Sequence, residues 1–120
     1  MILKLAHTKL DIFKLSKQMV LGMYRLSSKF PSDEKFAMTS QIRRAATSVH
    51  LNVAEGCSRK SEKERIRFFE ISRGSLVEVD AVIGLAFDLN YVKMEDINTV
   101  ENDVTRCFQM LCKMIENTSS

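Results

Sequence analysis

The sequence predicts an all-α fold: an antiparallel, up-and-down bundle of four helices in a single domain that spans residues 1–120. Apolar residues recur every three or four positions over long stretches, which is the spacing of one helical face. No alternation of the kind typical of strands persists for six residues, and the breaks between periodic segments are short, which favours antiparallel neighbours. A chain of 120 residues fits one domain.

The first two helices are predicted at about 5–29 and 33–55, with ends uncertain by two to four residues. Pro31 disfavours helical backbone at the residue before it, and Ser32 is expected to cap the second helix. Gly56 is placed where a left-handed residue would end that helix. The apolar face of the second helix consists of Met38, Ile42, Ala45, Ala46, Val49 and Val53.

The third and fourth helices are predicted at about 62–90 and 95–116. Ser61 and Glu64 have the spacing of a capping box at the start of the third helix. A softer break near Asn90 separates it from the fourth. The apolar face of the fourth helix consists of Ile97, Val100, Val104, Cys107, Phe108, Leu111 and Ile115.

The first and third helices carry more apolar residues than one buried face needs. Two readings remain open: a large core with some exposed methionine, or a surplus stripe that meets another subunit. We expect self-association, with Gly74 and Ser75 allowing a close approach of helices. The two adjoining stripes of the third helix are Ile66, Phe69, Leu76, Ile83 and Phe87, and Phe68, Ile71, Val79, Val82, Ala86 and Leu89. Those of the first are Leu10, Phe13, Val20 and Tyr24, and Ile12, Met19, Met23 and Leu26.

The charge is unevenly distributed along the chain. Residues 1–60 hold eleven Lys/Arg and four Asp/Glu, whereas residues 61–120 hold seven and eleven. This asymmetry permits an anionic partner, particularly if oligomerisation repeats a basic surface. The densest basic stretch, 59–67, includes two glutamates and no aromatic residue that could stack on a base, so an ordinary solvated helix start is an equal alternative to nucleic-acid binding.

Polar residues form a line along one flank of the second helix. Their spacings of three and four predict hydrogen bonds to a neighbouring helix, with ligand binding as the alternative. On the third helix, Arg73 and Asp80 are expected to pair, with each other or across a subunit boundary. The line consists of Gln41, Arg44, Ser48, Asn52 and Glu55.

The residue patterns of enzymes and metal proteins are missing from the sequence. His7 and His50 have no metal-ligand spacing, and the glycines are isolated rather than gathered in a phosphate-binding loop. We therefore expect no enzymatic activity, no metal and no cofactor. No apolar run approaches the roughly 18 residues of a membrane span, and the N-terminus does not resemble a signal peptide. Three cysteines without an export signal are expected to be free thiols in the cytoplasm, and Cys57, in a predicted loop beside basic residues, is the only candidate for a reactive one.

The central part of the chain resembles a known family, the four-helix-bundle proteins encoded within intervening sequences of bacterial 23S ribosomal RNA genes. The resemblance covers almost the whole chain and is most specific from Phe30 to Glu78. Ser72 and Arg73 depart from it, because the family usually has small apolar residues there. The matching residues are 30–36, 39–49 and 52–56, then Arg59, Ser61, 67–69, Gly74, Ser75 and Glu78.

The resemblance implies an antiparallel four-helix bundle that assembles into a homopentameric ring. It also implies kinship with the accessory protein of diversity-generating retroelements, a basic pentamer that partners a reverse transcriptase. A possible role in binding structured RNA or another nucleic acid follows from it, with a protein-interaction scaffold as the alternative and a ligand or metal site in the core as a third, weaker one. The candidate phosphate contacts are Arg43, Arg59, Lys60, Lys63, Arg65 and Arg67.

Overall fold

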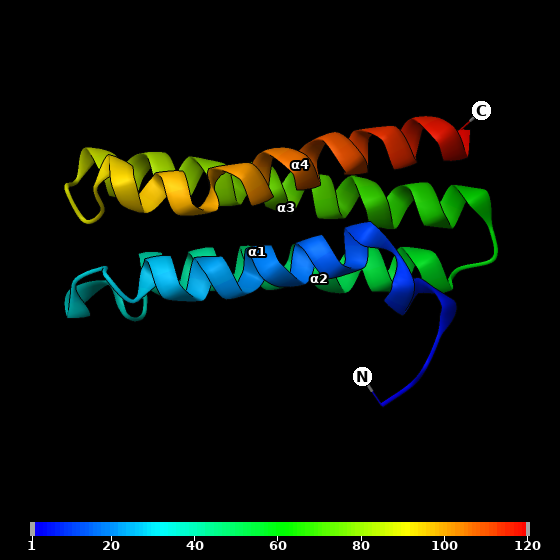
Figure 1. Cartoon of the computed structure of the whole chain (residues 1–120), viewed down its shortest axis with the longest axis horizontal. Coiled ribbons are helices and arrows are strands. Elements are labelled where there is room, and N and C mark those ends of the chain that lie inside the picture. Colours follow the sequence, from blue (N-terminus) through cyan, green and yellow to red (C-terminus); the bar gives the residue numbers. More distant parts are fainter. Residues whose placement is uncertain (1, 120) are drawn as a thin grey trace.

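Four α-helices run antiparallel to their neighbours along the chain in the computed structural model, which describes residues 2–119 (Figure 1). They occupy the corners of a square, because α1 and α3 each pack against both α2 and α4 while the diagonal pairs make no contact in the described chain. The predicted all-α, four-helix fold is confirmed. The helices are α1 (Asp11–Ser27), α2 (Met38–Ser58), α3 (Glu62–Asp88) and α4 (Met94–Ser119), with short 3-10 helices η1 (Ala6–Lys9) and η2 (Ser32–Glu34).

The core runs along the axis between the four helices, and each helix contributes a stripe of apolar side chains to it. Its buried polar groups have partners: the Ser16 hydroxyl donates to the Phe13 carbonyl at 3.1 Å, and the Ser72 hydroxyl donates to the Val49 carbonyl at 2.7 Å. Among the side chains that the structure describes, no buried nitrogen or oxygen lacks a hydrogen bond. The largest fully buried apolar residues are Phe69, Met19, Met23, Ile42, Leu76, Leu111, Val49, Val53 and Val79.

Both of the first two helices begin later than the sequence predicts. Leu10 is extended, with φ −71° and ψ 141°, and separates η1 from α1, which lets the His7 ring pack on Phe13 at 5.1 Å between centroids. Ser32 begins the turn η2 and does not cap α2, because the chain has to cross the end of the bundle between the two helices. Phe30, which precedes this crossing, is buried and packs against Tyr91.

Gly56 does not end α2, and the prediction of a left-handed residue there is wrong. The helix continues to Ser58, and no glycine in the described residues has a positive φ. A Cβ atom at Gly56 would lie 2.5 Å from Cε1 of Phe69. The glycine is therefore required by the close approach of α3, since real Cβ atoms essentially never come that near another atom.

The two ends of α3 carry well-defined caps. The Ser61 hydroxyl accepts a hydrogen bond from the Glu64 amide at 3.3 Å, as the capping-box spacing predicts. At the other end Asn90 has a φ of 63°. The amides of Asn90 and Tyr91 bond back to the carbonyls of Phe87 and Ala86, which is the hydrogen-bond pattern of a Schellman motif.

Most of the apolar stripes predicted as surplus on α1 and α3 lie in the core of the bundle itself. A corner helix buries two flanks, one against each neighbour, so a wide apolar arc is consistent with a single chain. Exposed apolar residues remain, and they include Leu21, Val77 and Leu85, which belong to none of the predicted stripes. From the predicted stripes, Leu10, Tyr24, Ile71, Phe87 and Leu89 are exposed.

None of the described helices is both long and apolar enough to cross a bilayer. All three cysteines are free thiols.

Candidate nucleic-acid interface

The fold converts the charge asymmetry of the sequence into a difference between two faces. Each half of the chain forms one antiparallel helix pair, so α1 and α2 make one layer and α3 and α4 the other (Figure 1). Residues 11–58 hold seven Lys/Arg and four Asp/Glu, whereas α3 and α4 together hold six and eleven. The α1–α2 layer is therefore the basic side of the molecule.

Five of the six predicted phosphate contacts gather where α2 turns into α3, at the end of the bundle that also holds both chain termini (Figure 1). Lys60, Lys63 and Arg67 are exposed and form no ion pair within residues 2–119. The guanidinium of Arg59 pairs with Glu55 at 3.0 Å and lies over the Phe68 ring at 4.9 Å. The remaining residue of the group, Arg65, lies over the Phe69 ring and donates to the Arg59 carbonyl.

Arg43, the sixth predicted contact, lies in the second turn of α2 and directs its donors at α1. Its Nε donates to the Ser27 hydroxyl at 2.8 Å and its Nη2 donates to the Tyr24 carbonyl at 3.3 Å. The guanidinium also covers the Tyr24 ring at 4.7 Å from the centroid. We call the group of Arg59, Lys60, Lys63, Arg65 and Arg67 the basic end. It begins sixteen residues after Arg43, which is about 24 Å along α2.

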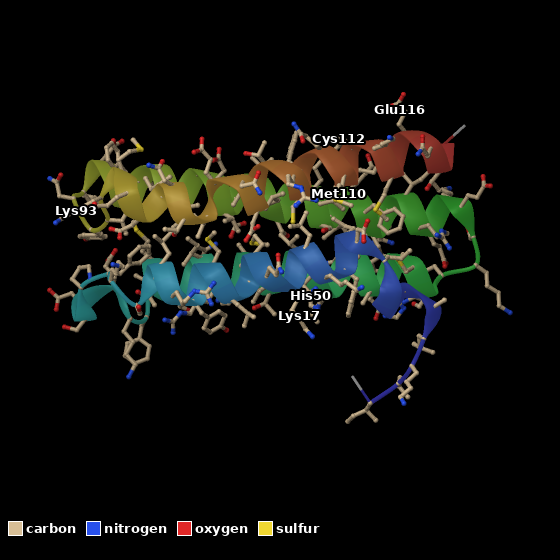
Figure 2. The ribbon with its side chains drawn as sticks, in the orientation of Figure 1. Lys17, His50, Lys93, Met110, Cys112 and Glu116 are labelled. Atoms are coloured by element: carbon tan, nitrogen blue, oxygen red, sulfur yellow. The ribbon has the colours of Figure 1, made fainter. Side chains whose placement is uncertain are left out.

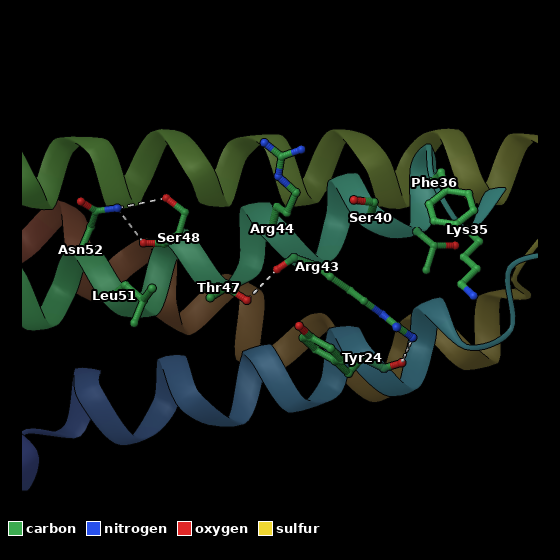
Figure 3. Close-up of a pocket in the computed structure, with 11 residues that line it drawn as sticks. Tyr24, Lys35, Phe36, Ser40, Arg43, Arg44, Thr47, Ser48, Leu51 and Asn52 are labelled. Atoms are coloured by element: carbon green, nitrogen blue, oxygen red, sulfur yellow. Dashed lines mark hydrogen bonds between the residues drawn. The ribbon is translucent and has the colours of Figure 1, made fainter. Parts of the chain in front are cut away.

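A groove of about 740 Å³ follows the outer surface of α2 beside α1, and we call it the α1–α2 groove (Figure 3). Three cationic side chains line it, Lys35, Arg43 and Arg44, and its lining includes no carboxylate. Phe36 stands at one end of it and is 89% exposed. The other lining residues are Tyr24, Thr39, Ser40, Thr47, Ser48, Leu51 and Asn52.

Arg44 differs from Arg43 in having no partner in the described chain. It is exposed, points away from Arg43 (Figure 3), and makes no hydrogen bond, ion pair or ring contact among residues 2–119. Lys35 likewise forms no ion pair there and contacts only the Phe36 ring, at 5.4 Å. Lys35 and Phe36 belong to the run that carries the family resemblance, but the sequence does not single them out as ligand contacts, since exposure beside a groove is decided by the helix packing.

Three members of the polar line join α2 to α3 or to one another. Gln41 donates to Glu78 on α3, and the hydroxyls of Ser48 and Ser75 are 2.8 Å apart. The Asn52 amide donates to the Ser48 hydroxyl at 3.0 Å and to its carbonyl at 2.8 Å. The last member, Glu55, does not bond to α3. Its carboxylate accepts a hydrogen bond from Arg59, the residue that follows α2.

Arg73 and Asp80 do not pair with each other within the part of the chain that the structure describes. Arg73 lies at the α3–α4 contact, where its Nη1 donates to the Cys112 sulfur at 3.6 Å. Asp80 lines a second groove of about 410 Å³ between α3 and α4, together with Val77 and Phe108.

His50 has a structural setting between α1 and α2 (Figure 2). Its Nδ1 is 2.7 Å from the Ser16 hydroxyl, and its ring packs on Phe13 at 4.5 Å between centroids. Burial lowers the pKa of His50, and the nearby charges of Lys17 and His7 lower it further. Because Ser16 is fully buried, this serine–histidine pair offers no accessible nucleophile.

Two of the three thiols, Cys57 and Cys107, are poorly suited to chemistry at neutral pH. Burial raises the pKa of Cys57, although the charge of Arg65 opposes the shift. Burial and the charge of Asp103 raise the pKa of Cys107 to about 12. The thiolate, which is the reactive form, is therefore disfavoured at both positions. No group of three or more His, Cys, Asp or Glu side chains in residues 2–119 is arranged to hold a metal ion.

Comparisons with known proteins agree with this fold. A crystal structure from Bacteroides thetaiotaomicron, described as a protein with unknown function from the S23 ribosomal protein family, superposes with a TM-score of 0.79. The two chains are 23% identical, and the match covers 87% of this chain and 97% of that one. No curated protein matches the chain.

The model of one protein family matches residues 8–113, which is most of the chain, and that family is described as 23S rRNA-intervening sequence protein. Neither comparison indicates an enzyme family. The matched range includes all of α1, α2 and α3 and most of α4. This chain therefore belongs to the 23S rRNA-intervening sequence protein family.

Proposed function

We propose that this protein is a non-enzymatic, homo-oligomeric nucleic-acid-binding protein of the cytoplasm, and that structured RNA is its ligand class. The observation that carries the proposal is the separation of charge between the two layers of the bundle. A layer with seven cations and four anions, in a chain whose other layer has the opposite balance, presents one side to a polyanion. The family's description places its genes in a ribosomal RNA context, which favours RNA over DNA.

The basic end of the bundle, where α2 passes into α3, supplies the phosphate contacts in this proposal; it adjoins the basic layer, and Lys63, Arg65 and Arg67 belong to α3 itself. Lys60, Lys63 and Arg67 are exposed and unpaired within residues 2–119, so their charges are available to phosphates. Arg59 and Arg65 are held in place by their contacts with the Phe68 and Phe69 rings. A guanidinium fixed by stacking retains its other donors for bidentate contact with phosphate oxygens.

Self-association is the second part of the proposal, and the exposed apolar residues between α3 and α4 support it. Val77 is 54% exposed and Phe108 is 41% exposed, and both line the α3–α4 groove. A contact between copies through this groove leaves the basic α1–α2 layer of each copy uncovered. Oligomerisation then repeats the basic layer, and the resemblance to pentameric relatives sets the expected number of copies at five.

Binding across a salt series tests the nucleic-acid proposal. We expect the affinity of the purified protein for a structured fragment of ribosomal RNA to fall linearly on a log–log plot against salt, with a slope that counts the phosphates contacted. The triple variant Arg59→Glu, Lys60→Glu and Arg65→Glu should bind more weakly with a shallower slope. Absent or salt-insensitive binding of the parent protein to both RNA and a matched duplex DNA would overturn the proposal.

A protein-interaction scaffold is the competing function, and the same apolar surface favours it. In that case the immobilised protein would capture one stoichiometric protein from a nuclease-treated lysate. The Arg59, Lys60 and Arg65 variant would capture it equally well. Loss of the captured material after nuclease treatment would instead support the nucleic-acid proposal.

A further inference from the structure

The α1–α2 groove has cations that no group in the described chain neutralises. Lys35 and Arg44 both line it and neither forms an ion pair within residues 2–119. The lining contains no carboxylate. Both charges are therefore available to an anion brought from outside.

Phe36 adds a second property to the same groove, because an 89% exposed phenyl ring at its end is a free aromatic face. The Lys35 ammonium lies beside this ring, 5.4 Å from its centroid. Aromatic side chains next to cations are the elements with which proteins hold single strands, since a base stacks on the ring while phosphates contact the cations. A base within a duplex is already stacked on its neighbours and cannot use this ring.

We propose that the α1–α2 groove binds an unpaired stretch of nucleic acid, with a base stacked on Phe36 and phosphates bound by Lys35 and Arg44. This inference rests on the proposed nucleic-acid function and specifies that single-stranded segments, such as loops of a structured RNA, are the part recognised. From Thr39 to Asn52 the groove follows α2 for thirteen helical steps, about 20 Å. That length is in keeping with the shortest known single-strand sites, of about four nucleotides.

The side chains along the rest of the groove are suited to sugars and base edges. The Ser40 hydroxyl lies near Phe36 and the Asn52 amide lies at the far end (Figure 3), and Thr39 is also part of the lining. Arg43 takes a positioning role, because its contacts with Ser27 and Tyr24 fix α1 against α2 and form the wall of the groove. A protein partner fits less well, since interface cores are depleted in lysine and an acidic counterpart would have to match both cations.

Fluorescence anisotropy with a labelled oligouridine of about ten nucleotides, and with the matched duplex, tests the inference. We expect Phe36→Ala to weaken binding of the single strand by about 5- to 100-fold without changing the salt slope, because a stacking contact carries no charge. Lys35→Gln and Arg44→Gln should each make the slope shallower by about 0.7. Arg106→Gln is the matched control, because this exposed arginine lies on α4, diagonally across the bundle from α2.

A direct readout of stacking is available because the chain contains no tryptophan. The Phe36→Trp variant has a single indole at the groove, and we expect oligouridine to quench its fluorescence while the duplex leaves it unchanged. Circular dichroism of each variant checks the fold, which should be unaffected because Phe36 makes no contribution to the core.

Different outcomes separate this inference from the proposed function. If no nucleic acid binds with a salt-dependent affinity, both fail. If binding persists and is lost only in the Arg59, Lys60 and Arg65 variant, the proposed function stands and the groove inference is overturned. Equal affinity for single strand and duplex would also overturn the groove inference. So would dissociation of an oligomer by Phe36→Ala in sedimentation experiments, because that result would assign the groove to a contact between copies.

Discussion

Gly56 illustrates how a single residue sets the distance between two helices. Its missing side chain lets the ring of Phe69, which is fully buried, approach the backbone of α2. Gly84, near the C-terminal end of α3, has no such neighbour, because a Cβ atom there would meet nothing within 4 Å. The two glycines therefore allow the packing effect to be separated from the helix propensity of glycine.

We expect Gly56→Ala to lower the free energy of unfolding by about 2 kcal/mol, since the added methyl group overpacks the contact with Phe69. Gly84→Ala should raise it by about 0.5–1 kcal/mol, because alanine is the better helix former. Urea unfolding of both variants against the parent measures the difference. Equal effects of the two substitutions would show that Phe69 can move aside without cost.

His50 gives the protein a pH dependence at the residue scale. Its pKa is lowered in the folded state by burial and by the charges of Lys17 and His7, whereas in the unfolded chain it returns to about 6.5. Below that pH the His50 side chain binds a proton more readily in the unfolded state than in the folded state. Stability therefore falls as the pH falls through this range.

We expect the urea midpoint of the parent protein to decrease as the pH is lowered from about 7.5 to about 5.5. The decrease should be smaller in His50→Gln, which cannot titrate, although this variant starts from a lower stability because it loses the ring packing on Phe13. His7→Gln serves as the control and should keep most of the pH dependence. A parent and a His50→Gln variant with parallel pH profiles would contradict this origin.

At the scale of elements, the ends of the helices are defined by local chemistry that the sequence reveals only in part. Ser61 is recognisable as a cap because its spacing to Glu64 is diagnostic. Asn90 is harder to recognise, since asparagine occurs in many kinds of loop, yet its φ of 63° is what ends α3 and turns the chain toward α4. Asparagine tolerates this conformation better than other residues with a side chain.

The conformation of Asn90 predicts opposite results for two substitutions. Asn90→Ala should lower the free energy of unfolding by about 1 kcal/mol, because a Cβ atom is strained at positive φ and alanine has no polar group to compensate. Asn90→Gly should leave it unchanged or raise it slightly, since glycine adopts this region freely. Thermal unfolding measures both, and a destabilised glycine variant would show that the Asn90 side chain matters more than its backbone.

At the scale of the whole molecule, exposed apolar residues accompany the separation of charge. The basic layer and the apolar α3–α4 groove lie on different sides of the bundle, so one can bind a polyanion while the other meets a second copy. The core is continuous along the bundle, and its buried polar groups are satisfied among the described side chains.

Sedimentation velocity should show a particle of several chains for the parent protein. Val77→Glu and Phe108→Glu should each weaken the association by at least about tenfold, because a carboxylate buried at a contact without a partner costs more than about 1.4 kcal/mol. Leu21→Glu is the control, since Leu21 is similarly exposed, at 52%, but lies on α1. A monomeric parent, or dissociation by Leu21→Glu alone, would contradict the assignment of this surface.

The sequence by itself determined the fold class, the number and order of the helices and the cap at Ser61. These follow from periodicity and from spacings within a few residues, which depend on the local chain. The uneven distribution of charge was also evident from the sequence, and so were the five cationic residues of the basic end.

Only the tertiary structure decided what depends on how the helices meet. It decided that Gly56 makes room for Phe69 instead of ending α2, and that Arg43 is held by α1 while Arg44 has no partner in the described chain. Adjacent residues on a helix point about 100° apart, so which of two arginines meets a neighbouring helix is set by the rotation of α2 in the bundle. The α1–α2 groove could not be predicted for the same reason, because its walls come from α1, α2 and the connection between them.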